Sequence, residues 1–349
     1  MPSAKTSPSQ ALPPRQPNKM PEHHDFTPAI VGPDQPHAQF DRLHIQTDTL
    51  TATAQDRVLP ILAEEQVFTC RQMAPTLRSL QTQLNRGLTV LDIGTGSGVL
   101  AIYAERVLNQ AAPYSTVQGV DRSPRAIAQA QHNSQANHCH PDYTHFHLVP
   151  DGYNHDSVAP ASQDIIITNP PFNPTYPGLQ GNLAFFGDSD DSGLHLFKTW
   201  MPAIAHHLRP TGILLGCQLS PVVDGTVVAL DVLRHTFGPT SHIEFCHILD
   251  GTCSMEAFLL GEYQDYLQTL PTAHAQPYRD WIAHVSTRYP AIAFVYYEAH
   301  KTGGHQAIVE TLQPRWLDFD RTWASRIIIH RDFVNSLAET APLSPTPEA

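Results

Sequence analysis

Residues 89–98 read Thr89-Val90-Leu91-Asp92-Ile93-Gly94-Thr95-Gly96-Ser97-Gly98, an apolar run that ends in three alternating glycines. We interpret it as a buried strand, residues 89–93, followed by a glycine turn and then a helix from Val99. The glycines let the backbone bend sharply and let a ligand come close, since no side chain intervenes. The first N–H groups of the helix would point into that gap. The run therefore predicts a site for a nucleotide-like ligand.

Short apolar segments alternate with helical patterns after this turn. Strands are expected at 117–121, 146–149, 164–168 and 213–219, and Ser123-Pro124 is typical of a helix start, with Ser as cap and Pro in the first turn. Strands that alternate with helices indicate a parallel sheet covered on both faces. We expect an α/β fold: a Rossmann-like, seven-stranded, mostly parallel sheet with helices on both faces, plus a helical insertion.

Composition divides the chain into segments. Residues 1–39 are rich in Pro, Gln and Ser and predict a disordered tail, as do residues 338–349. Residues 40–86 are expected to form a helical segment on the substrate side of the ligand-binding domain. That domain is expected to span 87–330, with the helical insertion at about 251–289.

The carboxyl-terminal part of that domain holds further candidate strands. Residues 243–249 and 291–299 have strand patterns. The turn-like Lys301-Thr-Gly-Gly304 suggests that residues 307–309 complete a hairpin with the strand before it. Residues 326–330 could form one more strand.

Charge and cysteine content narrow the class of protein. The 349 residues carry a formal charge of −12, which disfavours non-specific binding to nucleic acid. Five cysteines without a C-x-x-C pair favour a reducing compartment. No apolar run approaches the roughly 20 residues of a membrane span, and no apolar signal segment begins the chain. We expect a cytoplasmic protein without a membrane partner.

The glycine spacing argues against two common nucleotide sites. Val99 stands where a dinucleotide fingerprint needs a third glycine for helix packing, which disfavours a NAD-dependent oxidoreductase. No Lys-Ser or Lys-Thr follows the turn, so it is not a phosphate-binding P-loop. Asp92 could either hold the turn or bind an amino group. A ligand that carries an ammonium group fits better than one that carries a pyrophosphate.

Two acidic residues follow the next strands. Asp121 ends the second strand, where an acidic residue can bind ribose hydroxyls. It could instead cap the next helix, but Ser123 already suits that role. Asp151, in Pro150-Asp151-Gly152, could accept a hydrogen bond from an adenine amine or simply form a turn. The two readings of Asp151 are compatible.

Asn169-Pro170-Pro171-Phe172 indicates the reaction. It follows the strand 164–168 at the edge of the sheet where open parallel sheets bind substrates. The Asn169 side-chain oxygen and the Pro170 carbonyl can each accept one N–H of an –NH₂ group, which aims the nitrogen lone pair. Phe172 offers a face for a planar amide or base. Because such a nitrogen is a poor nucleophile, its electrophile must be activated, as a sulfonium methyl is.

These residues resemble the class I S-adenosylmethionine-dependent methyltransferases. The resemblance lies in Val90 to Gly98, Asp121 and Asp164 to Phe172, and it covers about residues 67–219. It points to the branch with an N-P-P-Y/F motif, which includes the HemK-type protein-glutamine N5-methyltransferases and small-domain rRNA and tRNA base methyltransferases. Phe172 and Asn173 depart from the usual HemK pattern of Tyr followed by an apolar residue. The family's N-terminal substrate domain is not recognisable here.

The resemblance implies S-adenosyl-L-methionine as cofactor and assigns roles to residues. Asn169 and Pro170 would hold the target amine, and Phe172 would stack on it. The cofactor-binding set would be Asp92, Gly94, Thr95, Gly96, Gly98, Asp121, Asp151 and Asn169.

No metal site is expected. Asp188 to Gly193 begins like a calcium loop, but Thr199 stands where that loop needs Glu, so we interpret it as a helix cap. His138-Cys139-His140, His145 and His147 fit no standard zinc spacing.

The expected function is N-methylation of a planar amide or amino nitrogen, with a protein glutamine favoured because the acidic chain suits a protein partner. The alternatives are an exocyclic amine of rRNA or tRNA (guanine N2 or adenine N6), a small-molecule amine or amide, and a catalytically silent scaffold of the same fold.

Overall fold

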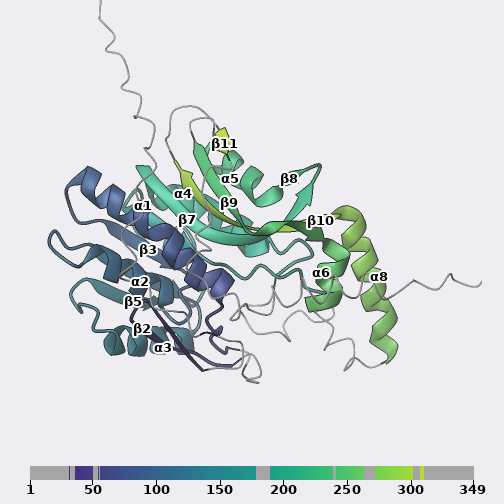
Figure 1. Ribbon diagram of the computed structural model, residues 1–349, viewed down its shortest axis with the longest axis horizontal. Coiled ribbons are helices and arrows are strands. Elements are labelled where there is room, and N and C mark those ends of the chain that lie inside the picture. Colours follow the sequence, from purple (N-terminus) through teal and green to yellow (C-terminus); the bar gives the residue numbers. More distant parts are fainter. Residues whose placement is uncertain are drawn as a thin grey trace, which may run out of the picture.

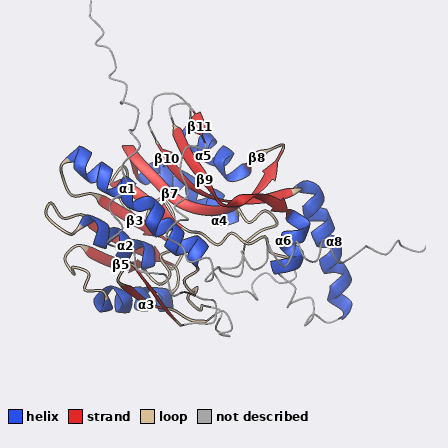
Figure 2. Cartoon of the chain, in the orientation of Figure 1, coloured by secondary structure: helices blue, strands red, loops and turns tan. Residues whose placement is uncertain are grey.

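The computed structural model describes residues 36–49, 56–177, 189–238, 241–262, 272–301 and 307–309, together with Val31 and Ala54. A twisted sheet runs through the molecule between two layers of helices (Figures 1 and 2). The predicted C-terminal tail and the candidate strand at 326–330 lie outside the described residues. Most of the predicted N-terminal tail lies outside them as well.

Five parallel strands form the core of the sheet, in the order β5-β4-β3-β6-β7. Their bounds are β3 Thr89–Ile93, β4 Thr116–Asp121, β5 Thr144–Leu148, β6 Gln163–Thr168 and β7 Leu208–Val223. All six residues of β6 are buried, because helices cover this part of the sheet on both faces. The predicted Rossmann-like α/β fold is confirmed, but the described part of the sheet has nine strands rather than the seven expected.

Antiparallel strands extend the sheet beyond β7. Strand β10 (Ala291–His300) lies between β7 and β9 (His242–Ser254) and is antiparallel to both. The short β8 (Thr226–Val227) pairs with the end of β7. The predicted hairpin at residues 307–309 is wrong: β11 (Ala307–Val309) pairs with β9 in parallel, so the chain that leaves β10 crosses over β9 to reach it.

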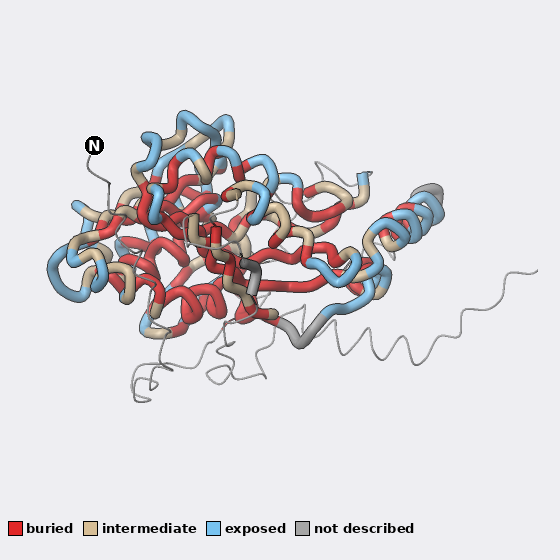
Figure 3. Tube along the Cα trace, turned by 90° about the horizontal axis from the view of Figure 1, so that it is seen from above, coloured by how far each residue is buried: buried red, intermediate tan, exposed pale blue. Residues whose placement is uncertain are grey.

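Helices divide between the two faces of the sheet. The face with α1 (Phe68–Leu84), α2 (Val99–Leu108) and α3 (Pro124–Ala136) encloses one core cluster. The opposite face, with α4 (His195–His207) and α5 (Val228–Phe237), encloses the other. Figure 3 shows that the buried residues follow the sheet between these layers. Among the described residues, no helix is both long and apolar enough to cross a membrane.

The order of the strands changes direction between β3 and β6. The chain passes from β3 outward to β4 and β5, then returns to β6 on the other side of β3. Connections that leave β3 and β6 in opposite directions open a gap at their carboxyl ends, where ligands of such sheets bind. Ile93 and Thr168 are paired in register, so Gly94 and Asn169 leave the sheet side by side.

A hairpin before α1 packs beside this edge. Its strands are β1 (His37–Phe40) and β2 (Leu43–Gln46), so β1 begins inside the predicted N-terminal tail. The Asn133 amide of α3 donates to the carbonyls of Gln46 and Ser97, both at 2.9 Å. This side chain therefore joins the hairpin to the glycine turn.

The opposite end of the sheet is held by a buried carboxylate. Asp164, at the start of β6, accepts two hydrogen bonds from the Arg86 guanidinium, at 2.6 and 2.7 Å, and one from the Thr89 N–H at 2.9 Å. Arg209 of β7 lies 3.3 Å from the same carboxylate. Burial would raise the pKa of Asp164, but the hydrogen bonds from Arg86 and Thr89 hold it below its ordinary value.

Along the chain, two helices separate β9 from β10, at the place where the sequence predicted an insertion. They are α6 (Met255–Glu262) and α8 (Thr272–Arg288), which lie side by side at one end of the molecule (Figure 1). Trp281 of α8 donates from its indole N–H to Asp191, at 2.9 Å. Tyr176 packs edge-on against Tyr278 and Trp281, at 5.3 and 5.7 Å between ring centroids. Helix α8 thus packs against Tyr176 and Asp191, two residues that follow Asn169 along the chain.

Two glycines of the turn, Gly98 and Gly96, have different surroundings. A Cβ on Gly98 would lie 2.9 Å from the Cβ of Ala130 and 3.2 Å from the Phe146 ring. Gly98 therefore allows α3 and β5 to pack closely. A Cβ on Gly96 would meet only the Gly94 carbonyl, at 3.9 Å, so this position faces open space.

Gly98→Ala should lower the free energy of unfolding by more than Gly152→Ala does. Both glycines have nearly the same left-handed φ, +81° and +79°, so both variants carry backbone strain of about 1–2 kcal/mol. Only Gly98 adds overpacking, worth about 1–3 kcal/mol more, because nothing lies within 4 Å of a Cβ on Gly152. Denaturant unfolding of both variants measures the difference, and equal losses would contradict the packing role.

Candidate functional site

The glycine turn is tied to the neighbouring strand. The N–H groups of Gly94 and Thr95 both donate to the Val120 carbonyl of β4, at 2.9 and 3.0 Å. The Gly98 N–H donates to the Thr95 carbonyl at 2.8 Å. These donors are therefore used within the protein, and the turn differs from a phosphate-binding loop, in which the backbone N–H groups point at the ligand.

The Asp92 carboxyl lies at the start of α2. Its side chain is 1% exposed, and one carboxylate oxygen accepts from the Thr95 hydroxyl at 2.6 Å and from the Ala101 N–H at 3.2 Å. The sequence predicted that the N–H groups of this helix face the ligand, but the Ala101 N–H is already bonded to Asp92. Of the two roles considered for Asp92, the structure shows that it holds the turn.

The other oxygen of Asp92 is buried without a hydrogen-bond partner among the described residues. Burial raises the pKa of Asp92 to about 7, although the bonds from Thr95 and Ala101 oppose this, and the nearby charge of Asp121 raises it further. A positive group placed beside this oxygen would lower the pKa and favour the ionised form.

Asp121 joins the glycine turn to the start of α3. One oxygen accepts from the Gly96 N–H at 3.0 Å and the other from the Ser123 N–H at 2.9 Å. Burial raises its pKa, and these two bonds oppose the rise. Ser123 accepts from the Ala126 N–H at 3.2 Å, which confirms the predicted helix cap. Each carboxylate oxygen of Asp121 still has lone-pair capacity for a hydroxyl donor.

Asp151 lies just beyond β5 and is exposed. The Gly152 N–H donates to the Val149 carbonyl at 2.8 Å and closes a turn around it. The Val149 N–H donates to the Asp121 carbonyl at 2.9 Å, which places this turn next to the end of β4. The turn is present, and the expected contact with an adenine amine stays a prediction.

Asn169 is half-buried and held from two sides. Its side-chain oxygen accepts from the Cys217 thiol of β7, at 3.1 Å between sulfur and oxygen. Its amide nitrogen donates to Glu65, at 3.3 Å. Cys217 is fully buried and Glu65 is 4% exposed. Burial, followed by the negative charge of Glu65, raises the pKa of Cys217, so it stays a thiol and can donate.

Glu65 belongs to η1 (Ala63–Val67), a π-helical turn that runs directly into α1. Gln66 donates to Glu65 at 3.0 Å and accepts from the Leu62 N–H at 2.9 Å, which fixes the turn. Sequence reasoning missed Glu65, although two adjacent acidic residues inside an apolar run were a usable signal. It also missed Cys217, for which the sequence carries no local signal.

Pro170 and Phe172 lie below the surface at the same edge. Phe172 is 6% exposed, and its ring centroid lies 5.3 Å from that of Phe294 in β10. The expected stacking of the Phe172 ring on a substrate stays a prediction. It requires that some of the residues that cover the ring move.

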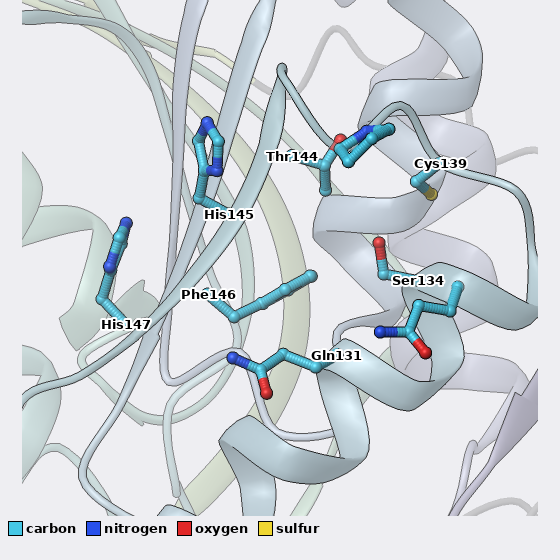
Figure 4. A pocket seen from close by; sticks show the side chains of 9 residues that line it. Gln131, Ser134, Cys139, Thr144, His145, Phe146 and His147 are labelled. Atoms are coloured by element: carbon cyan, nitrogen blue, oxygen red, sulfur yellow. The ribbon is translucent and has the colours of Figure 1, made fainter.

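A pocket of about 260 Å³ opens between α3 and β5 (Figure 4). Phe146 points toward the helix that carries Ser134, whereas His145 and His147 lie on the other side of the strand. These histidines and Cys139 do not gather around one point. The predicted helix cap in the calcium-like segment is wrong: Asp190 accepts from the N–H groups of Ser192 and Leu194, which form a turn just before α4, and among the described residues no side chain caps the helix itself.

Comparison with known proteins bears on the segment that builds this site. Residues 72–170 match the ribosomal protein L11 methyltransferase (PrmA) family. Over this segment the resemblance to methyltransferases is confirmed. A release factor glutamine methyltransferase of Geobacter sulfurreducens is 32% identical over 133 residues, 36% of this chain and 43% of that protein.

A second relative is similar over a shorter part of the chain, and a solved structure resembles it over a longer part. A tRNA1(Val) (adenine(37)-N6)-methyltransferase of Proteus mirabilis is 34% identical over 90 residues, 26% of this chain and 33% of that protein. The crystal structure of M. jannaschii TYW2 in complex with AdoMet covers 76% of this chain and 84% of that one, with a TM-score of 0.40 and 10% identity. The chain thus spans less than half the length of the curated relatives it matches.

Replacing Asp92 with Asn should stabilise the ligand-free protein more as the pH rises. A folded-state pKa of about 7, against about 3.9 unfolded, means that the folded protein binds more protons between these values and loses stability as the pH rises through them. The variant should therefore gain on the wild type between pH 5 and pH 8, by roughly 2.7 kcal/mol, because about two pH units separate pH 5 from the folded pKa and each is worth about 1.36 kcal/mol.

Denaturant unfolding at both pH values measures this gain. Asp164→Asn is the matched control. The pKa of the Asp164 carboxyl is lowered, so this group is ionised throughout the range, and the stability that the variant loses should not change with pH. A stability difference between Asp92→Asn and the wild type that does not change with pH would refute the raised pKa.

Proposed function

We propose that the chain is an S-adenosylmethionine-dependent methyltransferase that transfers the methyl group to a planar amide or amino nitrogen. The observation that carries the proposal is the side-by-side exit of the glycine turn and Asn169 from β3 and β6. A methyl donor above the turn would face a nitrogen held at Asn169, and such alignment supplies much of the rate of a transfer reaction.

The cofactor would occupy the open side of the turn. Gly96 allows close approach of its backbone, and Asp121 would accept hydrogen bonds from the ribose hydroxyls. The ammonium group of the methionine part suits the electronegative turn around Asp92 better than a phosphate does, and Asp151 would accept from the adenine amine. The bound sulfonium supplies an activated methyl group.

The acceptor nitrogen would be aimed by two oxygens. The Asn169 side-chain oxygen and the Pro170 carbonyl each accept one N–H of the substrate, which directs the nitrogen lone pair at the methyl group. Cys217 and Glu65 hold the Asn169 amide in one orientation, with its oxygen toward β7 and its nitrogen toward η1. A substrate N–H would share that oxygen with the thiol or replace the thiol as donor.

Among acceptors, a protein glutamine amide fits best. Glu64 and Glu65 are buried next to the acceptor site, and the chain has a net charge of −12. Such surroundings repel the phosphates of a nucleic acid, whereas an amide group is neutral and offers N–H donors. The name of the Geobacter relative agrees with this choice, and that of the Proteus relative makes a nucleobase amine the second candidate.

Transfer of labelled methyl groups to fractionated cell extract tests both the activity and the acceptor. Label from S-adenosylmethionine should enter protein, and glutamine N5 should carry it. Label in RNA would establish the second candidate, and label in small molecules the third. No transfer to any fraction would favour the silent scaffold and overturn the proposal.

Replacing Asn169 with Ala should lower turnover by ~10²–10³, the effect of losing one aligned hydrogen bond in a transition state. The cofactor affinity should change far less, because the acceptor side is altered. Steady-state kinetics on the labelled acceptor separates the two effects. Gln83→Ala, an exposed amide on α1, is the control, and turnover of Asn169→Ala equal to that of this control would exclude the assigned role.

Asp121→Ala should weaken S-adenosylmethionine binding by about 1.5–3 kcal/mol, through the loss of charge-assisted hydrogen bonds to the ribose. Calorimetric titration measures the affinity. Asp231→Ala removes an exposed carboxylate of α5 and should leave it unchanged. Equal affinities for the two variants would show that Asp121 only joins the turn to α3.

A further inference from the structure

Four potential metal ligands lie on one face of the sheet, away from the glycine turn. Strand β9 carries His242 and Glu244, and β10 carries Glu298 and His300. The strands are antiparallel and paired so that Glu298 is opposite Glu244 and His300 is opposite His242. Because side chains alternate along a strand, all four point to the face covered by α1.

The two carboxylates face each other across the strands. Like charges directly opposite in a sheet are destabilising, and Glu298 is only 1% exposed. Its two oxygens lie 2.7 and 2.9 Å from the Thr76 hydroxyl of α1, and the Tyr296 hydroxyl is 3.3 Å from one of them. These contacts fix the direction of the carboxylate.

We propose that Glu244, Glu298 and His300 bind one divalent transition-metal ion, which we take to be Zn²⁺. One ligand atom from each of the three lies within 4.8 Å of the others, and within the described residues this is the one such group of three. Two carboxylates and a divalent cation are together neutral, so the ion removes the repulsion within the pair and reduces the cost of burying it.

The geometry requires only a small adjustment. Ligand atoms around tetrahedral Zn²⁺ lie ~3.4 Å apart, since the bonds are about 2.0–2.2 Å long. Glu244 and His300 are half-buried and can move by the ~1 Å needed, whereas Glu298 stays fixed. His242 lies 3.3 Å from a Glu244 oxygen and orients that carboxylate. The bound ion would join the first residues of β9 to the last residues of β10.

Calorimetric titration of the chelator-treated full-length protein with ZnCl₂ tests this site. One equivalent should bind, and Glu244→Gln and His300→Gln should each weaken binding at least tenfold. Both variants change half-buried side chains, so they are expected to fold, and circular dichroism checks this. His145→Gln and His147→Gln, in the edge strand β5, are matched controls that should bind Zn²⁺ as the wild type does.

Two further measurements distinguish the site from adventitious binding. The unfolding midpoint should rise with Zn²⁺ in the wild type and not in His300→Gln. Bound Co²⁺ should show visible bands without the charge-transfer absorption of a thiolate ligand. Absence of binding, equal binding by His300→Gln and the controls, or a thiolate band would each overturn the proposal.

Discussion

The buried carboxylate of Asp92 is the constraint on which the ligand crevice depends. It lies one residue before the end of the central strand and binds both the glycine turn, through Thr95, and the first turn of α2, through Ala101. The positive end of the helix is therefore neutralised by the protein itself rather than by a ligand phosphate. The remaining oxygen is held in a place where water cannot reach it, and ionising it is costly. A ligand with a positive charge near the turn would offset that cost.

The acceptor side of the crevice is built by the segment that precedes the central strand. Glu65 reaches Asn169 from η1, and η1 is continuous with α1. One ion pair, Arg71 with Asp41, lies within this segment, and another, Arg125 with Asp48, fastens the segment to α3. The first of these is buried, and removing one partner would leave an uncompensated charge. Residues 40–86 therefore contribute directly to the geometry at Asn169.

Local patterns in the sequence were enough to predict the strands of the parallel core, the cap at Ser123 and the meeting of the glycine turn with Asn169. Each depends on periodicity or on the rule that parallel strands end at one edge. The orientation of the Asn169 amide depends instead on Glu65 and Cys217, which are 104 and 48 residues away along the chain. No local pattern says that these residues meet, even where one of them, Glu65, stands out in an apolar run. For the same reason the crossover that makes β11 parallel to β9 was mistaken for a hairpin.

The ion pair of Asp164, near the start of β6, affects the position of Asn169, which follows the end of the same strand. Arg86 and the Thr89 N–H donate hydrogen bonds to Asp164 at one end of the strand, and Asn169 follows the other end. Side chains alternate between faces, so sliding β6 by a single residue would turn Asn169 away from the crevice. The bonds to Asp164 thus set the register of a strand whose other end, at the opposite edge of the sheet, presents Asn169 to Glu65 and Cys217.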